Sequence, residues 1–324
     1  MLNAAIFGLG RWGLRLVDSV QGSDKIRFVR GISRDPGARR DFTEKTGVPL
    51  TARYDEVLAD RNVHAVVLAT PHSQHHEQII QAAAAGKHVF VEKPFTLTRA
   101  TAERAVTACQ KAGITLALGF NRRYAPAFLD LMRRLKLGEV GDVLHIEGQF
   151  SGGSGYQLKP GAWRASRLES PGGAMTARGV HALDAMIHIA GPVSGVFAFS
   201  DRRKLTVEVD DTTALMLRFA GGTTGYLSSL HATGEFWRVH VFGSAGWLEM
   251  RGDTELIRRG LEGPPVTLSF PALDKERAEL EAFAEAVAAK QAFLVPPAEA
   301  INGVAVLEAM SASAASGALV SIPA

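Results

Sequence analysis

Short apolar runs and amphipathic stretches alternate along the first 120 residues. Runs typical of strands that are covered on both faces occupy residues 2–7, 26–33, 63–69, 88–92 and 114–119. Stretches with apolar side chains at helical spacing lie between them at residues 11–20, 73–85 and 98–112. Strands separated by helices of this length predict an α/β domain with a parallel, doubly wound sheet.

The pattern changes after residue 120. Alternating apolar and polar positions, typical of strands with one solvent-exposed face, occur at residues 144–150, 196–200, 213–219, 223–229 and 237–243. A helix is expected to begin near His181, and two more helices follow, the second of them starting at Pro296-Pro297. We therefore expect a domain over residues 1–120 and an α+β domain over residues 121–324, the latter with a large, open, mostly antiparallel sheet.

Composition narrows the class of protein. The chain has 324 residues, a net charge of +3 and one cysteine, Cys109. The mild basic bias without charge runs favours anionic small molecules and argues against nucleic acid as a partner. A single cysteine excludes an internal disulfide and a cysteine metal cage. With neither a secretion signal at the start nor an 18-residue apolar run, we expect a cytoplasmic protein that does not contact a membrane.

A glycine-rich turn follows the first expected strand. Its sequence, GLGRWG, is made of Gly8, Leu9, Gly10, Arg11, Trp12 and Gly13. In a dinucleotide-binding turn, the glycine at the position of Gly8 permits the tight turn, and that at Gly10 lets the backbone approach a pyrophosphate. The glycine at Gly13 lets the helix pack close to the sheet. The motif predicts a Rossmann domain that binds a dinucleotide at the helix N-terminus.

The end of the second strand bears on which nucleotide binds. NAD sites usually place an acidic residue there, to accept a hydrogen bond from the ribose 2′-hydroxyl. This chain has Ser33 and then Arg34, which favours NADP because an arginine can hold a 2′-phosphate. The alternative interpretation leaves Arg34 in solvent and gives the acidic role to Asp35, which corresponds to NAD.

A second motif, VFVEKP at residues 89–94, ends a buried strand at the carboxyl edge of the sheet, where open α/β sheets bind ligands. Lys93 in this motif can donate to a substrate oxygen and lower the pKa of a neighbouring acid-base group. The alternative is an exposed turn lysine, which is the usual place of this residue type.

Taken together, these motifs make the chain similar to the glucose–fructose oxidoreductase, inositol dehydrogenase and MocA family. The resemblance covers essentially the whole chain and rests on five stretches, at residues 8–13, 69–75, 85–94, 119–124 and 163–184. It implies a Rossmann domain, a C-terminal open sheet that often mediates oligomers, and hydride transfer between NAD(P) and an alcohol or carbonyl, commonly of sugars and polyols, without a metal. Because the alternating strands need one face covered and few helices are available in this part of the chain, we also expect a homodimer or homotetramer that forms through this sheet.

The resemblance also implies roles for particular residues. Besides the glycine turn, Ser33 and Arg34, the expected cofactor contacts are Ala69, Thr70, Pro71, His72, His75, Glu92, Lys93, Pro94 and Asn121. The expected substrate contacts are Lys93, Arg122, Trp163, Arg164, Thr176, Arg178 and His181. Lys93 and His181 would face the reacting carbon and handle the proton. Although His72, His75 and His76 are close in the sequence, no carboxylate or cysteine completes a metal set.

His181 lies in the stretch GGAMTARGVHALD, residues 172–184. Members of the family that oxidise sugars usually carry an aspartate four residues before the histidine, where this chain has Ala177. This departure argues against oxidation of a polyol. It fits carbonyl reduction better, or a substrate with a carboxylate that Arg178 or Arg164 could hold. Asp184 either orients His181 or lies on the helix surface, and Arg123 is expected at the surface.

Two other functions remain open at the level of sequence. One is a nucleotide-sensing regulator that keeps the fold without turnover, as the loss of the acid at Ala177 would allow. Lys93 and His181 argue against it, since a sensor needs no proton donor. The other is a lyase or glycosidase that uses the nicotinamide only transiently.

Overall fold

The computed structural model describes residues 1–323, and these form two compact units. The first unit contains residues 1–96, 100–121 and 274–297. The second contains residues 97–99 and 122–273 and the chain from residue 298 on. Each unit has its own sheet, and each is described by itself below. None of the helices in the described part of the chain is long and apolar enough to cross a membrane.

The first unit is built on a wholly parallel sheet, which has six strands within residues 1–323 in the order β3-β2-β1-β4-β5-β6. The strands are β1 (Leu2–Phe7), β2 (Ile26–Ile32), β3 (Leu50–Thr51), β4 (Ala65–Leu68), β5 (His88–Glu92) and β6 (Leu116–Gly119). The helices are α1 (Arg11–Ser19), α2 (Arg40–Thr46), α3 (Tyr54–Ala59), α4 (His72–Ala84), α5 (Arg99–Ala112) and α8 (Lys275–Ala289). This strand order is the Rossmann topology, and it confirms the expected fold class.

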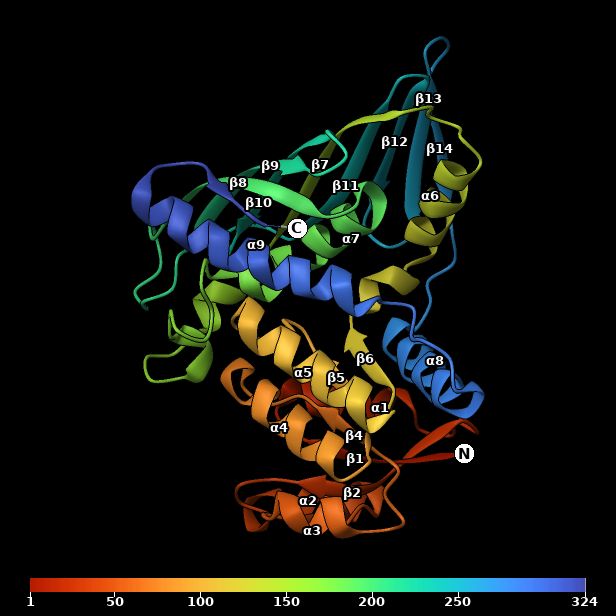
Figure 1. The fold of residues 1–324 in the computed structure, drawn as a ribbon, viewed down its shortest axis with the longest axis vertical. Helices are drawn as coiled ribbons and strands as arrows, with labels where there is room; N and C mark the ends of the chain where they lie inside the picture. Colours follow the sequence, from red (N-terminus) through yellow and green to blue (C-terminus); the bar gives the residue numbers. More distant parts are fainter. Residues whose placement is uncertain (324) are drawn as a thin grey trace. The chain divides into compact units, whose positions relative to one another are not determined.

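Helix α8 joins the first unit from far along the chain (Figure 1). Leu280 and Phe283 are wholly buried, and the Phe283 ring lies 5.8 Å from that of Phe90 in β5. Burying a side chain of this size stabilises a protein by about 1.5–3 kcal/mol. The apolar stripe of α8 therefore serves as part of the core beside β5.

The second unit is built on a mixed sheet, which in the described residues has nine strands in the order β14-β13-β12-β11-β7-β10-β9-β8-β15. Its strands are β7 (Val143–Ser151), β8 (Val193–Asp201), β9 (Thr212–Phe219), β10 (Thr224–Leu230), β11 (Phe236–Gly243), β12 (Gly246–Arg251), β13 (Glu255–Gly260), β14 (Val266–Ser269) and β15 (Val320–Ser321). Its helices are α6 (Pro126–Lys136), α7 (Val180–Ala190) and α9 (Pro297–Ser316). The pairing of β7 with β10 is parallel and the others are antiparallel, as expected of a mostly antiparallel sheet.

Helix α7 lies against the middle of the mixed sheet because glycine lines its path. A Cβ on Gly148 of β7 would come within 2.7 Å of the Met186 sulfur, and one on Gly225 of β10 would lie 2.9 Å from the Met186 methyl group. Helix α9 packs on the same region, since Gly303 approaches Ile187 of α7. Figure 1 shows α7 and α9 in front of the sheet.

The opposite face of the mixed sheet carries exposed apolar side chains. Successive residues of a strand point to opposite faces, so Glu147 points away from α7 when Gly148 points toward it. Tyr226 lies opposite Glu147, and the cross-strand row continues through Met216 to Phe197, so these side chains share that outer face. Two residues further along β8 is Phe199, which is 64% exposed. We call this surface the open face.

Candidate functional site

The glycine turn stands where the strand order of the parallel sheet reverses, between β1 and β4. Gly8 has φ +99°, and a Cβ there would lie 2.5 Å from the carbonyl oxygen of Ala69. A Cβ on Gly13 would collide with the carbonyl oxygen of Gly8. A Cβ on Gly10, in contrast, would meet no atom within 4 Å. Gly8 and Gly13 thus serve the packing of the turn, whereas Gly10 leaves room above the backbone for a ligand.

The N-terminus of α1 makes the space above Gly10 favourable for a negatively charged group. Gly10 is the N-cap residue, no side chain caps the helix, and no acidic residue lies in its first turn. The uncapped N–H groups and the helix dipole favour an anion there. Leu9 is buried and Arg11 is exposed. A dinucleotide diphosphate fits these residues.

The loop after β2 holds Ser33 and Arg34. The Ser33 hydroxyl donates to the carbonyl of Asp35 at 3.1 Å, and Arg34 is exposed. The Asp35 carboxylate accepts the N–H of Ala38 at 3.1 Å, within the short 3₁₀ helix Gly37–Arg39. Asp35 therefore already has a local structural role, although it is exposed.

The loop after β4 is fixed to the loop after β5 by a histidine. The His75 ring is wholly buried and contacts the carbonyl oxygens of Thr70 and Pro94, each at 3.1 Å. His72 is also buried, and its ring lies 5.9 Å from that of His75. The structure thus gives His75 a scaffolding role. Ala69 and Pro71 are the partly exposed residues of this loop.

Glu92 is the last residue of β5, Lys93 and Pro94 follow it, and a cis peptide bond joins these two. The Glu92 carboxyl lies over Gly119, where an added Cβ would come within 3.0 Å of it. Burial raises the pKa of Glu92 to about 7, although the charge of Lys93 and the indole of Trp12 oppose the shift.

A second buried carboxyl, Glu279 of α8, belongs to the same group. Among the described residues, neither of its oxygens has a hydrogen-bond partner. Burial raises its pKa well above the usual range, and the charges of Glu92 and Glu276 add to this, against Lys93 and Lys275. Sequence reasoning missed Glu279 because the pattern of an amphipathic helix does not show which structure covers it.

Asn121 and α8 are joined through Glu276. The Asn121 amide donates to one oxygen of Glu276 at 2.7 Å, and Arg15 of α1 donates to the other at 2.8 Å. Arg15 also pairs with Asp274 at 3.0 Å. Asn121 is thereby held at the end of β6 by the helix that also carries Glu279.

In the second unit, cationic side chains gather round the ring of Phe150 in β7. The guanidinium carbons of Arg122 and Arg178 lie 5.0 and 5.2 Å from the ring centroid, and the His181 ring lies 6.0 Å from it. Trp237 of β11 packs on the same ring at 5.0 Å. Three residues that are predicted to contact the substrate, Arg122, Arg178 and His181, thus lie around one aromatic ring.

The other predicted substrate contacts are placed differently. Thr176 is wholly buried and its hydroxyl donates to the Pro171 carbonyl. Arg164 is exposed, with its guanidinium carbon 4.2 Å from the centroid of the Trp163 ring.

The expectation that Arg123 lies at the surface is wrong. Arg123 is 2% exposed and binds both carboxylate oxygens of Asp184, at 2.6 and 2.8 Å. It also contacts Glu299 and His188. Asp184 is therefore buried as the partner of Arg123 and does not lie on the helix surface. A buried guanidinium needs this set of partners, and the sequence does not show which distant residues supply them.

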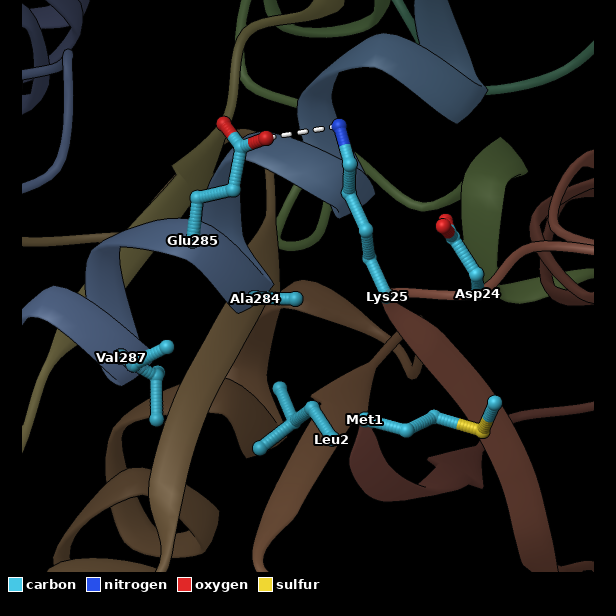
Figure 2. A pocket seen from close by; sticks show the side chains of 8 residues that line it. Met1, Leu2, Asp24, Lys25, Ala284, Glu285 and Val287 are labelled. Carbon is cyan, nitrogen blue, oxygen red and sulfur yellow. Dashed lines mark ion pairs between the residues drawn. The ribbon is translucent and has the colours of Figure 1, made fainter.

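Two surface hollows lie away from these residues. One of about 360 Å³ is lined by Leu2, Lys25 and Glu285, and Figure 2 shows the Lys25–Glu285 ion pair (2.6 Å) beside it. It lies at the amino end of β1, opposite the glycine turn. The other, of about 570 Å³, includes His88 and Cys109 near the amino end of β5. Within residues 1–323, no group of three or more His, Cys, Asp or Glu side chains could hold a metal ion.

Both parts of the chain match models of one known protein family. Residues 2–120 match the GFO/IDH/MocA oxidoreductase family, NAD-binding Rossmann fold, and residues 128–249 match the GFO/IDH/MocA C-terminal domain.

Three similar proteins illustrate the relationship. Myo-inositol 2-dehydrogenase of Thermotoga maritima is 30% identical over 76% of this chain and 74% of its own length. Scyllo-inositol 2-dehydrogenase (NAD⁺) of Bacillus subtilis is 31% identical over 59% of this chain, and the match spans only 54% of that enzyme. The crystal structure of aldose–aldose oxidoreductase from Caulobacter crescentus, complexed with glycerol, superposes with a TM-score of 0.89 at 25% identity, over 99% of both chains.

Proposed function

This chain belongs to the GFO/IDH/MocA family of oxidoreductases, and we propose that it transfers a hydride between NAD(P) and a CH–OH or carbonyl carbon of a sugar-like substrate. The observation that carries the proposal is the glycine turn, in which Gly8 and Gly13 serve packing and Gly10 leaves room for a diphosphate. The protein is an NAD(P)-dependent oxidoreductase by family, and the substrate class is our proposal. The relatives named above are dehydrogenases or oxidoreductases, so nothing favours the nucleotide-sensing alternative.

We propose that the cofactor is held by the glycine turn, by Ala69 to His72 after β4, and by Glu92 to Pro94 after β5. When bound, the nicotinamide accepts or supplies the hydride. Lys93 donates to the reacting oxygen of the substrate and stabilises negative charge on it. His181 takes the hydroxyl proton when an alcohol is oxidised and returns it when a carbonyl is reduced.

Two variants test this division of labour. His181→Asn should lower kcat by roughly 10²–10⁴ while NAD(P)H affinity stays unchanged, because general acid–base catalysis supplies that factor. Lys93→Met should lower kcat similarly and also raise KM. Circular dichroism controls for folding. Full activity of the His181 variant would contradict the assignment.

We further propose that NADP is preferred over NAD. The support is Arg34, exposed beside Ser33, and the hydrogen bond that the Asp35 carboxylate already accepts from the N–H of Ala38. Calorimetric titration should give tighter binding of NADPH than of NADH, and Ser33→Asp should reverse the order through repulsion of the 2′-phosphate. Equal affinity of the unchanged protein for both would overturn this preference.

The open face supports a homo-oligomer, a dimer or tetramer. Phe199 and Met216 are 64% and 51% exposed there, and exposed apolar side chains gathered on one sheet face are typical of subunit contacts. We also propose that the protein acts in the cytoplasm, where NAD(P)(H) is available to it.

A further inference from the structure

Arg178 sits in the π-helical turn Met175–Gly179, three residues before His181, and both side chains lie against Phe150. This turn and His181 together read MTARGVH, which contains no carboxylate. Within this stretch, Arg178 is the charged side chain that shares the Phe150 ring with His181.

The two arginines on the Phe150 ring differ in their partners. Arg122 is neutralised, since its Nη1 donates to both oxygens of Asp253 at 2.6 Å. Within residues 1–323, the only ion pair of Arg178 is with Glu235, at 3.6 Å, and that carboxylate is 69% exposed. An ion pair so long and so accessible to water contributes little. Apart from it, among the described residues, the Arg178 side chain hydrogen-bonds only to the Ser154 hydroxyl, from Nε at 3.4 Å. Its terminal nitrogens thus retain donor capacity.

The guanidinium of Arg178 is also held in place. A Cβ on Gly152 would come within 2.8 Å of its central carbon, so the group packs directly on the backbone at a position that a larger residue would close. Phe150 supports it from another side. The side chain is 21% exposed, which leaves it accessible to a ligand while much of its water is already removed. A cation fixed in this way loses little entropy on binding an anion.

The effect of this charge is visible on a neighbour. His231, which contacts Ser154, has its pKa lowered to about 4 by burial and by the charge of Arg178, against Asp211. Neither of the carboxylates that pair with the two arginines neutralises Arg178. Asp253 forms its ion pair with Arg122, and Glu235 is exposed to solvent.

We propose that Arg178 binds a carboxylate of the substrate, so that the sugar-like substrate is a polyhydroxy acid. The planar guanidinium offers two parallel N–H donors that match the two oxygens of a carboxylate. The acid group would dock on Arg178 while a hydroxyl-bearing carbon further along the chain reaches His181. This inference rests on the proposed function for the role of His181, but anion binding at Arg178 is measurable without turnover.

The test compares polyhydroxy acids with their neutral counterparts. Calorimetry on the 324-residue chain with NADPH bound would use aldonates of four to six carbons, such as gluconate, and the corresponding alditols, such as glucitol. We expect at least one aldonate to bind more tightly than its alditol, and Arg178→Gln to weaken its binding roughly 10- to 100-fold without affecting alditol binding. Arg178→Lys should restore part of the loss. Arg104→Gln, which removes the same charge from an exposed position of α5, should change nothing.

The outcomes separate this inference from the proposed function. If no aldonate binds better than its alditol, or if Arg178→Gln weakens both classes equally, Arg178 has a structural role and the inference is wrong. A bound aldonate that depends on Arg178 supports the inference even if the nicotinamide absorbance never changes, in which case it is the proposed hydride transfer that fails.

Discussion

Replacing Glu279 by glutamine should stabilise the protein at alkaline pH. Glu92 and Glu279 are both buried near Lys93, and burial raises the pKa of each. A carboxyl whose pKa is higher in the folded state than in the unfolded state costs stability as the pH rises between the two values, because the unfolded chain ionises first. The pair therefore makes the folded state less stable at pH 8 than at pH 5.

The size of the effect follows from Glu92. Its pKa is about 7 against an ordinary 4.5, a difference of about 2.5 units, and each unit corresponds to about 1.4 kcal/mol, so its ionisation lowers stability by roughly 3 kcal/mol. A glutamine at position 279 cannot ionise and cannot repel Glu92. We expect Glu279→Gln to raise the free energy of unfolding by roughly 1–3 kcal/mol at pH 8 and to change it little at pH 5.

Urea denaturation followed by tryptophan fluorescence, at one protein concentration and at both pH values, measures this difference. Glu285→Gln on the same helix is the matched control, since Glu285 is 59% exposed and its loss should change stability by less than about 1 kcal/mol. If Glu279→Gln shifts stability equally at pH 5 and pH 8, Glu279 does not titrate in this range and the reasoning fails.

Three further changes probe other parts of the structure. Arg123→Leu leaves the buried Asp184 without its partner and should cost about 3–5 kcal/mol, seen as a lower melting temperature; an unchanged melting temperature would show that the ion pair contributes nothing. Gly10→Ala should keep the melting temperature, because a Cβ there meets no protein atom within 4 Å, yet weaken NADPH binding at least about tenfold; unchanged affinity would show that the nucleotide does not bind at this turn. Phe199→Glu on the open face should lower the mass measured by light scattering, and a monomeric unchanged protein would exclude the proposed assembly.

Much of the fold can be predicted from the sequence because its strongest signals are local. The glycine turn, the buried strands 63–69 and 88–92, and the alternation of 213–219 each reflect a constraint that acts within a few residues. The glycine turn joins β1 to α1 in the structure, and the other three stretches form β4, β5 and β9. Shorter elements such as β3 and α3, of two and six residues, offer too few positions for a period to show.

What the sequence could not show depends on pairing between distant residues. Arg123 looks like a surface residue until Asp184, Glu299 and His188 surround it, and these come from positions 61 to 176 residues away. Patterning predicts α8 but not that Glu279 lies beside Glu92. Similarly, the sequence names both Arg122 and Arg178 as candidates, but only the structure distinguishes the arginine paired with Asp253 from the one that is not.

The proposed chemistry can be followed with a labelled cofactor. The protein would be incubated with NADPH that carries deuterium at C4 of the nicotinamide, on each face in turn, and with carbonyl forms of sugars and sugar acids, and the products analysed by mass spectrometry. We predict that the label from one face arrives at the carbinol carbon of a reduced product, and that His181→Asn slows this transfer without abolishing NADPH binding. A product that carries no deuterium, or a substrate that is converted without net oxidation of NADPH, would contradict hydride transfer as the function of this protein.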